Sequence, residues 1–199
     1  MGTTQTKSDK TRDVCYFDDG NMKCEKWYKD NICHRDGDEP AVIDYYEDRK
    51  IKAQWWCKNG YNHRDTDLPA LIDYYEDGEI KTQRWYQHGY IHRENGPARI
   101  EILKNTKFDI ETGKICQSNG DIYRIEYWYK NGQNWDCDGP VVIHYNNNIK
   151  IREVWYKRVY MNQGKIERFK KWSNLMHLEL ENVDYFPDGK PKREIFVVE

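Results

Sequence analysis

Every second residue stays apolar in four stretches of the chain, while the positions between them vary. These apolar positions are Ala41, Ile43 and Tyr45; Ala70, Ile72 and Tyr74; Ala98, Ile100 and Ile102; and Val141, Ile143 and Tyr145. A period of two residues places alternate side chains on one face of a β-strand. We therefore expect four strands with one buried face each, and no stretch shows the period of an amphipathic helix.

Glu76-Asp77-Gly78 comes shortly after the second stretch, and similar residues at matching places predict tight hairpin loops at residues 18–20, 47–49, 76–78 and 187–189. Such a three-residue loop ends in a residue with positive φ, where glycine is favoured. Arg49 takes that place in the second loop and is expected to cost about 1 kcal/mol of strain. Second turns are expected at Asn31, Gly60 and Gly89, 11 residues after the first three loops, and at Gly132, 11 residues after Asp121. Folding the strands back over the loops predicts the pairs Tyr74–Ile80, Asp73–Lys81 and Ile72–Thr82, and likewise Tyr45–Ile51, Asp44–Lys52 and Ile43–Ala53.

The strands and loops belong to a repeat, because Trp27, Trp56 and Trp85 lie 29 residues apart. A period of this length is typical of stacked supersecondary units that bury their apolar faces against one another. We place repeats near residues 27–55, 56–84, 85–102 and 128–154, an insertion near 103–117, and a degenerate C-terminal cap at 156–199. Residues 1–12 are expected to form a disordered tail, and residues 13–199 one repeat domain. The expected fold class is all-β, with stacked antiparallel hairpins in an elongated single-layer or rolled sheet.

Composition narrows the class of protein. Only 38% of the residues are hydrophobic, 33% are charged and the mean hydropathy is −1.09, which favours a thin sheet covered by 16 Tyr and 8 Trp side chains. A net charge of −2 does not predict a nucleic-acid partner. No apolar run has the length of a membrane span, so we expect a soluble, intracellular protein. The six cysteines show no C-x-x-C spacing, which favours free thiols over a zinc site or disulfide framework.

The candidate chemistry is sparse. His34, His63 and His92 each precede an arginine, but equivalent residues of stacked hairpins lie roughly 10 Å apart, too far to share one metal ion. Asp44, Asp73 and Glu101 each have a basic neighbour and are interpreted as surface pairs. We therefore expect no enzymatic activity, no cofactor, no metal and no small-molecule substrate. The candidate partner-binding or stacking residues are Trp27, Trp56, Trp85, Trp128 and Trp155, together with Phe196 and Val197 near the C-terminus.

The pattern W-Y-x-x-G-x-x-H-R-x-x-G-P-A-x-I-x-Y resembles the divergent MORN-type repeat found in some bacterial proteins and in large DNA viruses. Residues 85–102 and 128–145 match it best, and the resemblance covers most of residues 13–160. It implies a non-enzymatic scaffold that binds other proteins, such as capsid proteins or further copies of itself, and for the viral version a minor capsid component in the virion or the host cytoplasm. Two alternatives stay open: a peripheral adaptor in contact with a membrane, and a bacterial protein that neutralises a toxin.

Overall fold

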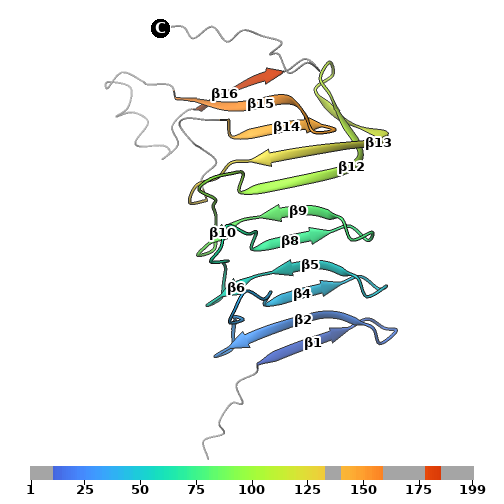
Figure 1. Ribbon diagram of the computed structural model, residues 1–199, viewed down its shortest axis with the longest axis vertical. Coiled ribbons are helices and arrows are strands. Elements are labelled where there is room, and N and C mark those ends of the chain that lie inside the picture. Colours follow the sequence, from blue (N-terminus) through green and yellow to red (C-terminus); the bar gives the residue numbers. More distant parts are fainter. Residues whose placement is uncertain (1–10, 133–139, 159–177, 185–199) are drawn as a thin grey trace, which may run out of the picture. The chain divides into compact units, whose positions relative to one another are not determined.

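Strands and turns make up the whole described structure, which is a computed structural model covering residues 11–132, 140–158 and 178–184 (Figure 1). The expected all-β class is confirmed, and none of these residues forms a helix. One large antiparallel sheet has the open strand order β1-β2-β4-β5-β8-β9-β12-β13-β14-β15-β16. Within the described ranges, no helix is long and apolar enough to cross a membrane.

The chain divides into two compact units. The first comprises Met1–Ile102 and Lys130–Gln133, and the second comprises Leu103–Tyr129 and Asn134–Glu199. The predicted tail lies outside the described residues up to residue 10, and the first strand begins at Arg12. The predicted loop at 187–189, the residues Phe196 and Val197, and most of the predicted cap also lie outside them.

In the first unit, each repeat contributes a hairpin of the large sheet and a short hairpin beside it. The sheet strands are β1 (Arg12–Tyr16), β2 (Met22–Lys29), β4 (Val42–Tyr45), β5 (Ile51–Trp55), β8 (Leu71–Tyr74), β9 (Ile80–Arg84) and the start of β12 (Arg99–Asp109). The short strands are β3 (Ile32–Cys33), β6 (Cys57–Lys58), β7 (Tyr61–Asn62), β10 (Tyr86–Gln87) and β11 (Tyr90–Ile91). Strand β3 pairs with the end of β2, β6 with β7, and β10 with β11.

The turn residues explain both kinds of hairpin. The predicted three-residue loops end at Gly20, Arg49 and Gly78, with φ of 84°, 70° and 87°. The predicted second turns are two-residue turns with positive φ at both positions, such as Asn59 and Gly60. This is the geometry of a type I′ turn, which matches the twist of the strands that it joins.

The register beyond the three-residue loops differs from our prediction. The pairs Tyr74–Ile80 and Tyr45–Ile51 are confirmed, but an irregularity follows each, so that Asp73 lies opposite Thr82 and Ile72 opposite Gln83. The predicted pairs of Asp73 with Lys81 and of Ile72 with Thr82 are therefore wrong, as are those of Asp44 with Lys52 and of Ile43 with Ala53, because Ala53 lies opposite Asp44. A loop closed by a residue at positive φ commonly adds a bulge, which shifts every later pair by one residue.

The prediction of a single buried face is also wrong. Ala41, Ala70 and Ala98 are fully buried, but Leu71 is buried too, and it points to the opposite face from its neighbour Ala70. The alanines sit where backbones approach closely, since the N–H groups of Trp27, Trp56 and Trp85 donate to their carbonyl oxygens at 2.8 Å. Ile43 and Ile72 are only half-buried. Burial in this unit is therefore divided between the two faces of the strands.

Arg49→Gly is expected to raise the free energy of unfolding by up to about 1 kcal/mol, because glycine reaches φ of 70° without a Cβ clash. The Arg49 guanidinium donates to the Asn21 side chain at 2.8 Å, but this contact is exposed and contributes little. Urea unfolding measures the change. Gly78→Ala is the matched control, since φ there is 87° and the added methyl group meets no atom within 4 Å. It should destabilise, and a stabilising Gly78→Ala together with a destabilising Arg49→Gly would contradict this account.

The second unit contains the remainder of β12, β13 (Lys114–Tyr127), β14 (Val142–Asn146), β15 (Ile149–Arg158) and β16 (Leu178–Asp184). The predicted insertion at 103–117 lies within the β12 and β13 strands and their turn, where Gly113 N–H donates to the Asp109 carbonyl oxygen at 2.8 Å. The core of this unit consists of Phe108, Tyr123, Ile125 and Ile151. The His144 ring stacks on Phe108 and Tyr123 at centroid distances of 5.7 and 5.9 Å.

Candidate functional site

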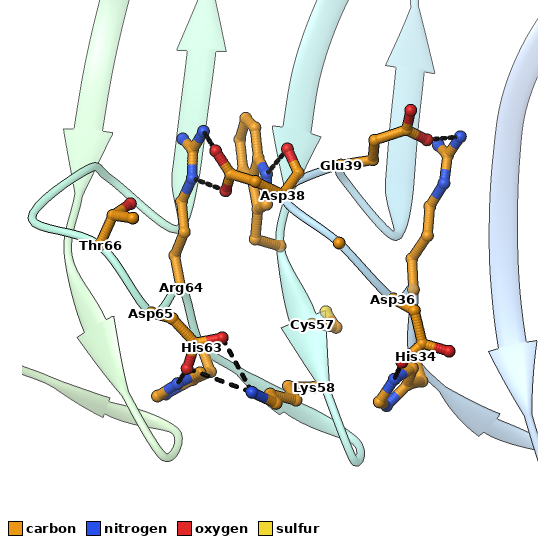
Figure 2. Close-up of a pocket in the computed structure, with 13 residues that line it drawn as sticks. His34, Asp36, Asp38, Glu39, Cys57, Lys58, His63, Arg64, Asp65 and Thr66 are labelled. Carbon is orange, nitrogen blue, oxygen red and sulfur yellow. Dashed lines mark hydrogen bonds and ion pairs between the residues drawn. The ribbon is translucent and has the colours of Figure 1, made fainter.

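Arginine, tryptophan and aspartate side chains link consecutive repeats in the first unit (Figure 2). The Arg64 guanidinium lies over the Trp56 ring at 4.0 Å and donates to both carboxylate oxygens of Asp38 in the preceding repeat, at 2.6 and 2.8 Å. Its remaining nitrogen donates to the Pro69 carbonyl oxygen at 3.1 Å. The next repeat has the same arrangement. Arg93 lies over the Trp85 ring at 4.1 Å and donates two hydrogen bonds of 2.9 Å to the Asp67 carboxylate.

The tryptophans themselves lie inside this link. Trp56 is 7% exposed and its indole N–H donates to the Asp38 carbonyl oxygen at 3.3 Å, while Trp85 donates to Asp67 at 3.2 Å. The hydrogen bonds from Arg64 and Arg93 also lower the pKa of the Asp38 and Asp67 carboxyls below their usual range. The structure therefore gives Trp56 and Trp85 a stacking role and leaves them little surface for a partner.

The other predicted aromatic residues are placed differently. Trp27 is half-buried, between Arg35 at 3.9 Å and Arg12 at 5.3 Å from its ring centre. Trp128 lies in the second unit, where its backbone N–H donates to the Val141 carbonyl oxygen at 2.9 Å. Its indole nitrogen is buried without a hydrogen-bond partner among the described residues. The side chain of Trp155 lies outside the described part of the chain.

Each histidine of the repeats joins its own bend to the next turn. The Nδ1 atoms of His34, His63 and His92 accept hydrogen bonds of 3.1 Å from the backbone N–H groups of Asn59, His88 and Asn131. Their Nε2 atoms lie 2.9, 2.9 and 3.1 Å from Asp36, Asp65 and Glu94. Hydrogen bonds from Lys58 and His63 lower the pKa of Asp65 to about 2. Within the described residues, no group of three or more His, Cys, Asp or Glu side chains is placed to hold a metal ion.

The predicted carboxylate ladder lies on one face of the sheet. Asp44 and Asp73 are both opposite Ala53, and burial raises the pKa of each above its usual range. Arg84 lies 3.8 Å from Asp73, and Arg99 forms an ion pair with Glu101. Asp73 and Glu101 therefore each have a basic partner, but the partner of Asp73 is Arg84 and not the predicted Lys81.

The cysteines depart from our expectation of free thiols. Cys15 and Cys24 lie directly opposite each other on β1 and β2, with a Cα–Cα distance of 5.1 Å, and form a disulfide. The hairpin loop between them brings the two residues together, a pairing that cysteine spacing alone did not suggest. Cys33 and Cys57 lie on consecutive short hairpins, and a hydrogen bond from the Cys57 thiol lowers the pKa of Cys33 to about 7. Cys33, Cys57 and Cys116 are the free thiols of the described residues.

A row of exposed apolar side chains was not predicted from the sequence. Ile32, Tyr61 and Tyr90 occupy equivalent places directly after the type I′ turns and are 49%, 61% and 63% exposed. We call these three residues the exposed row. Repeat alignment could have found it, because an apolar residue follows the turn in each of the three repeats. A surface groove of about 480 Å³ adjoins Tyr61 and Tyr90. This tyrosine groove is also lined by Lys58, Asn59, His63, Asp65 and His88.

Comparison with protein-family models, curated proteins and solved structures finds no match for this chain. The likeness to MORN-type repeats therefore rests on the sequence pattern alone.

Proposed function

We propose that this chain is a non-enzymatic repeat scaffold that binds another protein through the side of its short hairpins. The exposed row carries the proposal. Contiguous apolar patches on a protein surface often mark sites of interaction, and here exposed apolar side chains recur at the same place in three consecutive repeats. Repeat proteins commonly bind along such an extended, periodic surface.

The reactive side chains of the repeats support the same proposal. Arg64, His63 and Asp38 all take part in hydrogen bonds within the repeat array. Their counterparts Arg93, His92 and Asp67 do the same. These hydrogen bonds hold the short hairpins in a fixed order, which keeps the exposed row in register.

The test uses the full chain as bait, beside a variant with Tyr61→Ser and Tyr90→Ser. Capsid proteins and a second copy of this chain, the partners that the MORN resemblance implies, are tested first in purified form, and co-purifying proteins are identified by mass spectrometry. We expect at least one partner to bind the unaltered chain with a measurable Kd and to be lost with the variant. Binding that is identical for both chains would contradict the proposal, and so would the absence of any reproducible partner.

A further inference from the structure

The aromatic rings of the tyrosine groove have a regular spacing. This spacing determines which conformation of a bound segment fits the groove. Successive short hairpins are joined directly, since Gly89 N–H donates to the Asn62 carbonyl oxygen at 3.0 Å and Gly132 N–H to Ile91 at 2.9 Å. In the large sheet each repeat adds two strands, and neighbouring strands lie about 4.7 to 4.9 Å apart, so equivalent residues of successive repeats are about 9.5 Å apart. Tyr61 and Tyr90 occupy equivalent places and therefore present their rings about 9.5 Å apart.

Glycine sets the position of these rings. A Cβ at Gly89 would lie 3.0 Å from Cδ1 of Tyr61, and one at Gly132 would lie 3.2 Å from Cδ1 of Tyr90. Ile32 has the same relation to Gly60, at 3.0 Å. Each side chain of the exposed row thus packs against the glycine backbone of the next turn. This contact holds the row in place while more than half of each tyrosine remains exposed.

In the turns before Tyr61 and Tyr90, the backbone N–H groups already have acceptors and are not free to pair with a β-strand. The N–H groups of Gly60 and Gly89 donate to Cys33 and Asn62 in the preceding hairpin, and those of Asn59 and His88 donate to histidine Nδ1 atoms. An extended β-strand would in addition repeat every two residues, or about 6.7 Å, which does not match the spacing of the rings. Addition of a strand at this surface is thereby disfavoured.

A polyproline II helix matches the spacing of the rings and needs no backbone donors from the turns. It has three residues per turn and rises about 3.1 Å per residue, so one turn spans about 9.3 Å. It has no internal backbone hydrogen bonds and needs no ladder of donors, and proline-rich segments dock in grooves lined by aromatic rings. The charged side chains beside the groove favour an uncharged ligand, because Lys58 lies 2.8 Å from Asp65 and the two side chains neutralise each other.

We infer that the tyrosine groove binds a proline-rich segment in the polyproline II conformation, with successive turns of the ligand packed against Tyr61 and Tyr90. This inference rests on the proposed function and names the kind of partner segment that the exposed row would take.

The experiment titrates the full chain into fluorescein-labelled decaproline and follows fluorescence polarisation. Decaproline made of D-proline, which forms the mirror-image helix, and a glycine-serine peptide of equal length are the ligand controls. We expect saturable binding of L-decaproline and binding at least about tenfold weaker for both controls. Tyr61→Ser and Tyr90→Ser should each raise Kd about thirtyfold or more, the loss typical of an aromatic hot spot. Tyr61→Phe keeps the ring and should change Kd less than Tyr61→Ser.

Tyr16→Ser is the matched protein control, because Tyr16 is 60% exposed and lies on β1, away from the exposed row. Its Kd should stay within about twofold of the unaltered chain, and far-UV spectra establish that every variant is folded. Equal affinity for L- and D-decaproline, or affinity that survives both serine substitutions, would overturn the inference. So would tyrosine-dependent binding of a β-linked oligosaccharide without binding of decaproline. A protein partner that is lost in the double variant while decaproline fails to bind would leave the proposed function standing and refute the inference alone.

Discussion

Trp56→Ala is expected to lower the free energy of unfolding by about 3 to 5 kcal/mol, the range for removing a large aromatic side chain from a packed site. The ring is 7% exposed, it lies 4.0 Å from the Arg64 guanidinium, and its N–H donates to Asp38 of the preceding repeat. The substitution therefore removes apolar burial, a cation–π contact and an inter-repeat hydrogen bond together. Urea unfolding followed by far-UV circular dichroism measures the loss.

Two further variants separate these contributions. Trp56→Phe keeps an aromatic surface for Arg64 but removes the indole N–H, and should cost about 1 kcal/mol beyond the smaller buried area. Trp85→Ala should cost as much as Trp56→Ala, because Trp85 is 6% exposed and has the same set of contacts. If both alanine variants lost less than about 1 kcal/mol in the free energy of unfolding, these rings would behave as surface side chains. Partner binding would then be the better interpretation of their role.

Acid is expected to destabilise the second unit through His144. Burial and, to a smaller extent, the nearby Arg152 charge lower the pKa of His144 from 6.5 to about 4. The folded state therefore binds a proton only near pH 4, whereas the unfolded state binds one near pH 6.5. Because the unfolded state holds more protons between these values, stability falls as pH decreases from about 6.5 to about 4 and is unaffected by this group above that window. At 1.36 kcal/mol per pKa unit the shift corresponds to about 3 kcal/mol, and we expect about 2 because the ring is only partly buried.

His144→Asn is the control for this pH dependence. The Nδ1 atom of His144 is hydrogen-bonded to the Tyr123 hydroxyl, and the amide of asparagine supplies a hydrogen-bonding group in the same part of the side chain without titrating. The free energy of unfolding is measured by urea titration at several pH values for both chains. The difference between them should shrink or reverse as pH falls through the window. Equal slopes, or an imidazole signal that titrates near 6.5 in the folded chain, would contradict this expectation.

Turn chemistry was the part of the fold that the sequence predicted best. Positive φ at Gly20, Arg49 and Gly78 follows from loop length alone, because few three-residue loops fit a hairpin. The bulge after each loop was not predicted, since a two-residue period does not mark where an extra residue enters one strand, and the shift reassigned the partner of Asp73. A repeat pattern records what its members share, so it does not mark where the chain divides into two compact units.

The candidate site was predicted in part. The equal spacing of His63 and Arg64 with their counterparts correctly indicated structural hydrogen bonds, because every repeat needs the same link to its neighbour. Trp56 had two interpretations from sequence, stacking or partner binding, and only its burial beneath Arg64 decides between them. Tyr61 and Tyr90 were overlooked because exposure of an apolar residue after a turn depends on how far the short hairpin projects beside the sheet.

The Asp38–Arg64 and Asp67–Arg93 links affect how cooperatively the repeats fold. Each pair connects one repeat only to the next, so the folding free energy of this unit resembles a chain of nearest-neighbour couplings. A repeat in the middle of such a chain takes part in these links on two sides, whereas the first repeat takes part only through Asp38. Amide exchange should then be graded along the repeats instead of following a single global opening.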